Sequence, residues 1–160
     1  MTSRKWGNSS REQLNSCTVD VQWLLTQVLL NVADLTIIEG HRNEERQNSL
    51  YPKFTKLKFP HGKHNRYPSE AVDIQPYPRP KNNIRLCSAL GYIAGAAKQI
   101  GERRGLIVRW GGDWDGDGDV TDQTFDDLFH IEVKREENFR PFSDSELDLL
   151  RSVGLNAGER

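Results

Sequence analysis

The sequence predicts a single α+β domain in which a small, mainly antiparallel sheet is flanked by helices. A chain of 160 residues, of which 36% are hydrophobic, has the size of one domain with one core. Two long segments repeat their apolar residues at helical spacing, and several short segments alternate apolar and polar residues as strands do. The two kinds of segment do not alternate regularly, which favours α+β over a doubly wound parallel sheet.

The N-terminal half of the chain supplies two predicted helices and a strand. Residues 9–12, SSRE, have the form of a capping box, and the apolar residues after them recur mostly at helical spacing, which predicts one helix over residues 10–32. The β-branched run 35–39 predicts a short strand. Asn43 then caps a short polar helix that continues to residue 50.

The middle of the chain contains a predicted loop, a strand and a long helix. Residues 52–70 are rich in Lys, Pro, Gly, Asn and His without sustained periodicity, so we expect a long loop, and such loops are often functional. Residues 71–75 alternate as a half-buried strand does, which puts Asp73 on one face with its second neighbours. Apolar residues at helical spacing then predict a helix over residues 83–104.

The C-terminal part adds two predicted strands and a short helix. Residues 106–110 and 128–133 are the strands, and an acidic loop rich in glycine joins them. Ser143 begins a second capping box, which predicts a last helix. We therefore expect residues 1–160 to form one domain, with residues 134–160 as a C-terminal tail or short helix packed on it.

Composition argues against several classes of partner. The 22 Lys and Arg residues are balanced by 23 Asp and Glu residues, so no overall positive field favours nucleic acid. No segment approaches the roughly 18 apolar residues of a membrane span, and the N-terminus lacks the apolar core of a secretory signal. We expect a monomer that is made in the cytoplasm and not inserted into a membrane, with Cys17 and Cys87 as reduced core thiols.

Side chains with metal-binding chemistry are few. A catalytic zinc ion usually has three protein ligands and an open position for water, and the chain has four histidines, at positions 41, 61, 64 and 130. His64 precedes the strand that carries Asp73, and His130 lies within another strand, so a shared sheet face would bring the three together. The alternative is an exposed His64, an edge carboxylate at Asp73 and a hydrogen-bonded core His130, and spacing alone does not decide between these interpretations.

Motifs around these residues resemble those of a known family. The segment GKHNRYPSEAVDIQPYP, residues 62–78, resembles the first zinc motif of the D-alanyl-D-alanine carboxypeptidase and dipeptidase group of metallopeptidases, S-x-H-x-x-G-x-A-x-D. The segment DLFHIE, residues 127–132, resembles the second motif, in which an acidic residue stands three positions before the last histidine. The segment LIVRWGGDW, residues 106–114, is similar to one in phage endolysins that cleave the L-alanyl-D-glutamate bond. The resemblance extends from about Trp6 to Val133.

This resemblance implies the Hedgehog/DD-peptidase type of fold and a zinc centre. Zn²⁺ would be bound by His64, Asp73 and His130. Asp127 corresponds to the acidic general base, and Asp126 is the adjacent alternative. Zinc lowers the pKa of bound water to about 7, and a neighbouring carboxylate can pass the remaining proton to the leaving amine.

The resemblance also implies residues that contact the substrate. The segment GHRNEERQ is similar to a G-x-R-x-x-x-x-Q stretch of the family, so we expect Arg42 to stabilise the oxyanion and Gln47 to support substrate binding. Two features depart from the family pattern. Nine positions instead of seven separate His64 from Asp73, so the turn between them must bulge, and Gly62 stands where the motif has serine.

The acidic loop begins like an EF-hand calcium loop. Oxygen ligands at positions 1, 3 and 5 are followed by glycine at position 6, but the match ends at position 12, where threonine replaces the bidentate glutamate. We expect a structural or regulatory Ca²⁺ site, with an acidic solvated turn as the alternative; the residues concerned are Asp113, Asp115, Asp117, Asp119 and Asp122. Because these carboxylates would repel one another in a turn without a bound ion, the sequence favours the Ca²⁺ site over the solvated turn. Because the loop ends close to the expected general base, we hypothesise that Ca²⁺ orders that residue.

The sequence thus predicts a zinc-dependent peptidoglycan endopeptidase of the endolysin type, which hydrolyses the L-alanyl-D-glutamate bond of bacterial cell-wall stem peptides. One alternative is a D-alanyl-D-alanine carboxypeptidase or dipeptidase with the same zinc centre, and another is a non-catalytic wall-binding module. Without a secretory signal, the enzyme would remain in the host cytoplasm until a phage holin permeabilises the membrane, and would then act on the cell wall.

Overall fold

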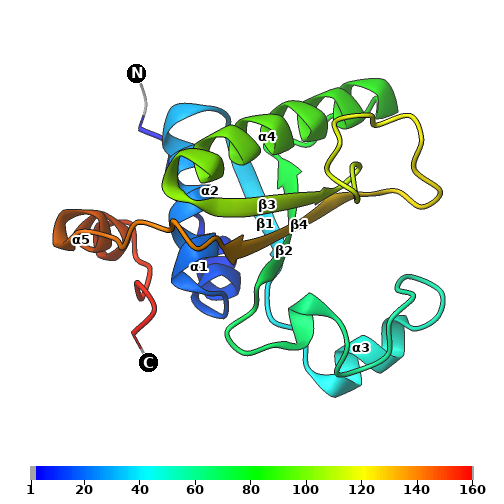
Figure 1. Ribbon diagram of the computed structural model, residues 1–160, viewed down its shortest axis with the longest axis horizontal. Helices are drawn as coiled ribbons and strands as arrows, with labels where there is room; N and C mark the ends of the chain where they lie inside the picture. Colours follow the sequence, from blue (N-terminus) through cyan, green and yellow to red (C-terminus); the bar gives the residue numbers. More distant parts are fainter. Residues whose placement is uncertain (1–2, 160) are drawn as a thin grey trace.

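The computed structural model describes residues 3–159 and forms one domain. Within that span, the elements are α1 (Asn8–Asn15), α2 (Val19–Asn31), β1 (Leu35–Glu39), α3 (Glu44–Leu50), the single 3-10 turn η1 (Lys63–Asn65), β2 (Ala71–Pro76), α4 (Asn83–Arg104), β3 (Leu106–Gly111), β4 (Asp127–Arg135) and α5 (Asp144–Ser152). The strands form one antiparallel sheet in the order β1-β2-β4-β3 (Figure 1). The α+β class with an antiparallel sheet and flanking helices is confirmed.

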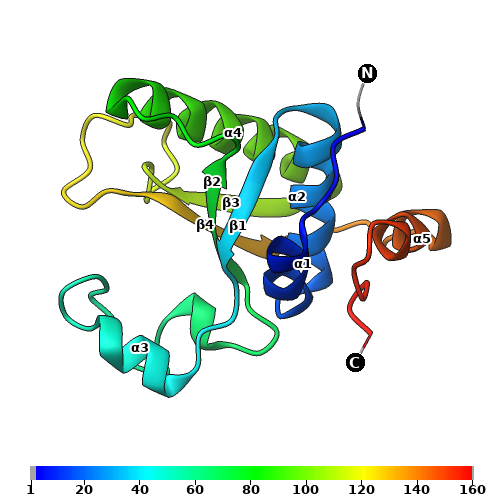
Figure 2. The ribbon, with the colours of Figure 1, turned by 180° about the vertical axis from the view of Figure 1, so that it is seen from behind.

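One face of the sheet forms the core and the other is left for the site. Strand residues at alternate positions, among them Ile37, Ile74 and Ile131, are buried in one cluster with apolar side chains of α2 and α4. Figures 1 and 2 show α2 and α4 packed along the sheet, whereas α3 lies beyond the end at which β1 leaves it. Among residues 3–159, no helix is long and apolar enough to cross a membrane.

The predicted single helix over residues 10–32 is wrong, because the chain breaks it into α1 and α2. Ser69 pairs with the backbone at the break: its amide donates to the carbonyl of Ser16 at 2.9 Å, and its carbonyl accepts from the amide of Thr18 at 2.9 Å. Thr18 then caps α2 through its side chain. The lengthened segment between His64 and Asp73 therefore has a structural use, since it carries the residue that pairs with the helix junction.

Two smaller expectations also fail. The predicted capping box at residues 9–12 does not form, because α1 begins after Gly7 without a side-chain cap and the Ser10 hydroxyl accepts a hydrogen bond from the amide of Ile37 instead. Cys17 is a buried thiol as expected, but Cys87 is exposed on α4. Helical periodicity identifies the element on which Cys87 lies, but this residue falls outside the buried stripe.

The remaining predicted elements are present. The caps of α3 and α5, Asn43 and Ser143, accept hydrogen bonds from the amides that the sequence indicated, and α4 spans the predicted 83–104. The long loop over residues 52–70 is interrupted by η1. In the C-terminal segment, Leu150 of α5 is fully buried in the core cluster, as is nearly all of Leu155.

Candidate active site

Register across the sheet brings three polar residues into one row. Glu39 on β1 pairs with Asp73 on β2, and Asp73 pairs with His130 on β4. Asp73 and His130 are on the face opposite the core, because residues 72 and 131 point into the core from the neighbouring positions. Glu39 pairs with Asp73 because the register of β1 shifts between residues 37 and 39. The strands therefore place a carboxylate and an imidazole side by side without any contribution from loops.

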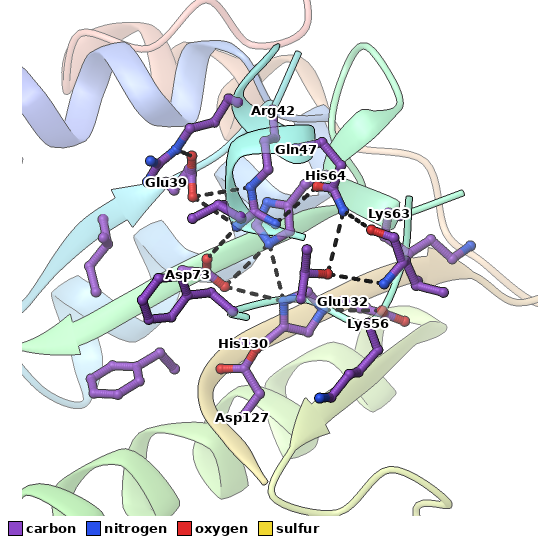
Figure 3. A pocket seen from close by; sticks show the side chains of 18 of the residues that line it. Glu39, Arg42, Gln47, Lys56, Lys63, His64, Asp73, Asp127, His130 and Glu132 are labelled. Atoms are coloured by element: carbon purple, nitrogen blue, oxygen red, sulfur yellow. Dashed lines mark hydrogen bonds and ion pairs between the residues drawn. The ribbon is translucent and has the colours of Figure 1, made fainter. Parts of the chain in front are cut away.

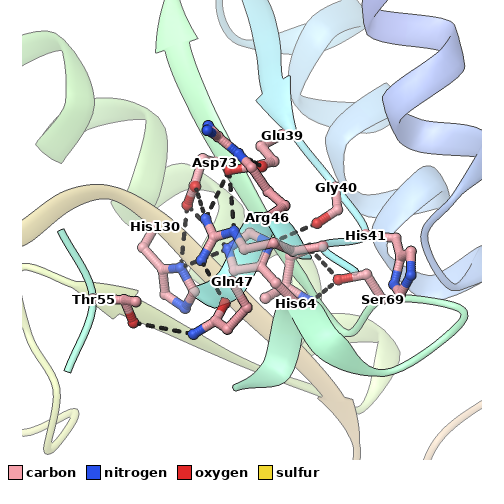
Figure 4. Close-up of polar contacts among 12 residues, drawn as sticks. Glu39, Gly40, His41, Arg46, Gln47, Thr55, His64, Ser69, Asp73 and His130 are labelled. Carbon is pink, nitrogen blue, oxygen red and sulfur yellow. Dashed lines mark hydrogen bonds and ion pairs between the residues drawn. The ribbon is translucent and has the colours of Figure 1, made fainter. Parts of the chain in front are cut away.

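His64 joins this row from η1, which stands over the sheet. The His64 carbonyl accepts from the amide of Arg42 at 2.7 Å, which ties the turn to the segment after β1. The imidazole is 3% exposed, so it is buried against the strands instead of pointing into solvent (Figure 4). The three predicted ligands are thus brought together by η1, β2 and β4.

The three candidate ligand atoms form a nearly equilateral triangle. His64 Nε2 lies 3.2 Å from Asp73 Oδ1 and 3.1 Å from His130 Nδ1, and His130 Nδ1 lies 3.2 Å from Asp73 Oδ1 (Figure 3). Tetrahedral zinc with bonds near 2.0 Å separates its ligand atoms by roughly 3.3 Å. The geometry and the donor set of two imidazoles and one carboxylate both fit a metal ion, and Zn²⁺ prefers such ligands.

The second ring nitrogen of each histidine is already occupied. His64 Nδ1 donates to the carbonyl oxygen of Gly40 at 2.6 Å, which leaves Nε2 with its lone pair in the neutral ring. His130 Nε2 donates to Glu132 Oε1 at 3.1 Å, which leaves Nδ1 for the triangle. Sequence reasoning missed Glu132. The signal was its position two residues after His130 on a strand, which puts both side chains on one face.

The local electrostatics favour a charged carboxylate among the ligands. Burial opposes ionisation of Asp73, but without a metal its close contacts with the ring nitrogens of His130 and His64 hold its pKa well below the usual range. Burial also opposes the charged form of His130, yet its hydrogen bonds to Asp73 and Glu132 raise the pKa to about 9. A divalent cation would take over the role of balancing the Asp73 charge.

Arg42 lies next to the triangle and is held rigidly. Its guanidinium donates to Asp73 Oδ2 at 3.2 Å, to Glu39 Oε2 at 2.8 Å and to Gln47 Oε1 at 3.2 Å. Gln47 is 1% exposed, and its amide nitrogen donates to the carbonyl of Leu57 at 2.6 Å. The structure therefore places Gln47 behind Arg42, where it orients the guanidinium and anchors the following loop.

The two candidate general bases differ in their surroundings. Asp127 begins β4, is half-buried and lines the cleft, whereas Asp126 is exposed and does not line it. Burial and the nearby charge of Asp73 raise the pKa of Asp127 above its ordinary value. A carboxylate with a raised pKa accepts and returns protons more readily near neutral pH, so Asp127 is the better candidate for the base.

The triangle lies at the floor of a cleft of about 570 Å³. One wall comes from α3 and the loop after it, including Arg46, Phe54 and Leu57, and the other comes from the acidic loop, including Trp114 and Phe125. The Trp114 ring packs on the His130 ring with centroids 5.5 Å apart. The cleft therefore places a potential peptide between two loops and directly over the candidate ligands.

The acidic loop brings some of its carboxylates together. Oxygens of Asp113, Asp115 and Asp117 lie within 4.8 Å of one another, whereas Asp119 and Asp122 are outside this cluster. Asp113 is buried and accepts from the amides at positions 116 and 118, at 3.0 and 3.2 Å. Two glycines with positive φ, at these same positions, let the loop fold around that carboxylate.

Neither of the two other histidines joins the site. His41 is turned away from the triangle, with Nδ1 3.0 Å from the carbonyl of Arg66. His61 is exposed in the loop after α3. Neither ring therefore contributes an atom to the triangle.

Comparison with known proteins identifies the family to which the chain belongs. A curated relative, the L-alanyl-D-glutamate peptidase of Escherichia phage T5, is 27% identical over 134 residues, which cover 83% of this chain and 91% of the relative. The crystal structure of the L-Ala D-Glu endopeptidase ChiX of Serratia marcescens has the same fold, with a TM-score of 0.64 at 20% identity over 83% of this chain and 92% of that one. The family model described as phage L-alanyl-D-glutamate peptidase matches residues 2–134, and the protein therefore belongs to this family of peptidoglycan peptidases.

Proposed function

We propose that this peptidase hydrolyses the L-alanyl-D-glutamate bond of cell-wall stem peptides with one zinc ion bound by His64, Asp73 and His130. The observation that carries the proposal is the triangle of ligand atoms, whose sides of 3.1 to 3.2 Å suit tetrahedral zinc. Three protein ligands leave a fourth position for water, as in catalytic zinc sites, whereas structural sites are closed by four.

The residues around the triangle have complementary roles in this proposal. A bound zinc ion would supply a polarised water and a Lewis acid for the scissile carbonyl. Asp127 takes the proton of the attacking water and returns it to the leaving nitrogen of D-glutamate. Arg42 presents a fixed positive charge beside the site, where negative charge develops on the carbonyl oxygen. Because Gln47 and Glu39 hold Arg42 in place, this charge needs no reorganisation during the reaction.

The two alternatives differ from the proposal in their products. A D-alanyl-D-alanine carboxypeptidase would release D-alanine from muropeptides, a wall-binding module would release nothing, and the proposed enzyme would expose a new amino terminus on D-glutamate. The family match supports the proposed bond. We further propose that the protein acts on the host wall after a membrane lesion releases it from the cytoplasm.

The test combines product analysis with metal analysis. Purified muropeptides are digested with wild type, His130→Ala and His61→Ala, and bound zinc is measured for each protein. We expect the wild type and His61→Ala to bind one zinc and cut before D-glutamate, because His61 is exposed outside the site. His130→Ala should lose both properties. Release of D-alanine, or activity of His130→Ala without zinc, would contradict the proposal.

For the acidic loop, we propose a Ca²⁺ site at Asp113, Asp115 and Asp117, in which Asp119 and Asp122 assist from outside the cluster. Trp114 lies within this sequence and can sensitise terbium luminescence, which Ca²⁺ should quench by displacement. Asp117→Asn should lose the signal, and Asp122→Asn tests whether that residue closes the site. If calcium chelation at fixed zinc leaves peptidase activity unchanged, the loop does not order Asp127.

A further inference from the structure

The substrate class named in the proposed function carries a charge close to the scissile bond. In stem peptides, D-glutamate continues the chain through its side-chain carboxyl group, so its α-carboxylate is free. That carboxylate is attached to the same carbon as the nitrogen that leaves, and Asp127 must come close to this nitrogen to protonate it. The enzyme must therefore accept a substrate anion beside its own general base.

This part of the cleft is already acidic. Asp127, Glu132 and Asp73 all line it, and none of these carboxylates can attract another carboxylate. The proposed zinc ion could attract one, but it is needed for the scissile carbonyl. Like charges a few ångströms apart repel strongly in a cleft of reduced dielectric. Binding of D-glutamate with a free α-carboxylate is therefore favoured by a cationic side chain that has no carboxylate partner in the protein.

Four of the five cationic Lys and Arg side chains that line the cleft within residues 3–159 are already paired. Arg42 pairs with Glu39 and Asp73, Arg46 with Glu39, Lys63 with Glu70, and Arg109 with Glu132. The remaining cation is Lys56, for which the described part of the chain offers no ion pair or hydrogen bond. Elimination thus leaves one ammonium group free for the substrate.

The position of Lys56 is fixed by its neighbours. The Thr55 hydroxyl and the Leu57 carbonyl both accept hydrogen bonds from the amide of Gln47, at 3.4 and 2.6 Å. Gln47 is buried and also holds Arg42 at 3.2 Å. The loop is thereby tied to the catalytic floor on both sides of Lys56. Lys56 and Asp127 both line this cleft, and in the view of Figure 3 both side chains are drawn below the His130 ring.

We infer that Lys56 binds the α-carboxylate of the D-glutamate residue at the scissile bond. This inference rests on the proposed function. The side chain of Lys56 is long and flexible, so its ammonium group can reach a carboxylate held beside Asp127 while the backbone of the loop stays anchored. The consequence is selectivity: the enzyme prefers stem peptides with a free D-glutamate carboxylate over those in which this group is amidated to D-isoglutamine.

The experiment compares two synthetic stem peptides that differ at this group alone. L-alanyl-γ-D-glutamyl-L-lysine and its α-carboxamide analogue are each incubated with zinc-loaded wild type, Lys56→Met and Lys56→Arg. The matched control is Lys53→Met, because Lys53 lies in the same loop, has its ammonium 5.1 Å from the Phe54 ring and does not line the cleft. The measurements are kcat and KM for each pair, together with the thermal midpoint of every variant.

We expect Lys56→Met to lower kcat/KM on the free acid by about tenfold or more, as loss of a hydrogen bond to a charged group does, mainly through KM. On the carboxamide the same variant should resemble the wild type, and Lys56→Arg should retain most activity on both peptides. Equal losses on both peptides, or no preference of the wild type for the acid, would overturn the inference while the proposed function stands. Failure of the wild type to cut either peptide would overturn both.

Discussion

His64 and His130 direct different ring nitrogens, Nε2 and Nδ1, to the centre of the triangle. In each ring, the hydrogen-bond acceptor at the other nitrogen determines which nitrogen faces the triangle. For His64 the acceptor is the backbone carbonyl of Gly40, which cannot be removed by substitution. For His130 it is the side chain of Glu132, which is ion-paired with Arg109 at 3.4 Å. Arg109 in turn donates to the carbonyl of Trp114 at 2.8 Å, and the Trp114 ring packs on His130. His130, the less buried of the two, is therefore held by the side chains of Glu132 and Trp114, whereas His64 is held by a backbone carbonyl.

This arrangement predicts that Glu132 sets the affinity of the proposed metal site. Because Glu132 lies at the opposite ring nitrogen from the triangle, it acts through His130 and not as a ligand. Glu132→Leu should weaken zinc binding about 10- to 100-fold, the usual effect of removing an acceptor behind a ligating histidine. Glu132→Gln keeps a carbonyl acceptor and should restore most of the affinity. Competition with a chromophoric chelator measures both, and equal affinities for the Leu variant and the wild type would refute the role.

Asp127 and Asp126 allow a matched test of the general base. Asp127→Asn should lower kcat about 10²- to 10⁴-fold while zinc stays bound, because the amide cannot accept the proton of the attacking water. Asp126→Asn removes the same charge from an exposed neighbour and should change kcat little. Muropeptide hydrolysis and metal analysis are measured on each variant. The assignment fails if Asp127→Asn remains active or if the two variants behave alike.

At the scale of elements, Gly40 connects the helix junction to the candidate metal site. A Cβ at this position would meet the Ser16 hydroxyl at 2.6 Å and the Cys17 sulfur at 2.8 Å, and it would also collide with the Gln13 carbonyl. The same residue supplies the carbonyl that orients His64. The end of β1 is therefore packed directly against the turn between α1 and α2, and side-chain bulk there must displace the backbone.

Gly40→Ala should accordingly destabilise the fold by about 1–3 kcal/mol, the usual cost of overpacking, and should weaken zinc binding as well. The control is Gly95→Ala in α4, where a Cβ would meet nothing within 4 Å. Since glycine is a poor helix former, that variant should be more stable than the wild type by roughly 0.5–1 kcal/mol. Denaturant unfolding measures both changes. If the free energy of unfolding of Gly40→Ala equals that of the wild type, the close packing around Gly40 does not contribute to stability.

The elements also show which features a single sequence could reveal. Period-two alternation around Asp73 and His130 was sufficient to predict their strands, because each strand has one buried face. The pairing of Asp73 with His130 itself depends on register between segments more than fifty residues apart, and the backbone at the break in the first helix pairs with Ser69. Local propensity contains no information on such contacts. The ligand set could therefore be proposed through family resemblance. The spacing of Glu132 and His130 on one strand places both on the same face, but the contact between them is visible only in the structure.

For the whole molecule, the site joins parts of the chain that only folding brings together. The ligands come from η1, β2 and β4, with 66 positions between His64 and His130. An unfolded chain cannot hold an ion with this geometry, so binding of the proposed zinc ion would be thermodynamically linked to folding. The core cluster spans α2, α4, α5 and the sheet, which suggests that most of the fold can persist without the metal.

Removal of zinc should therefore lower stability without unfolding the protein at room temperature. At a free zinc concentration 100 to 1,000 times Kd, binding adds about 2.7 to 4.1 kcal/mol, which corresponds to a rise in Tm of roughly 5–15 °C for a chain of this size. Scanning calorimetry of chelated and zinc-loaded protein measures the shift. His61→Ala should reproduce it, since His61 is exposed and separate from the triangle, whereas Asp73→Asn should abolish most of it. Equal midpoints with and without zinc in the wild type would mean that the triangle binds no zinc, because zinc bound to the folded chain alone must raise the midpoint.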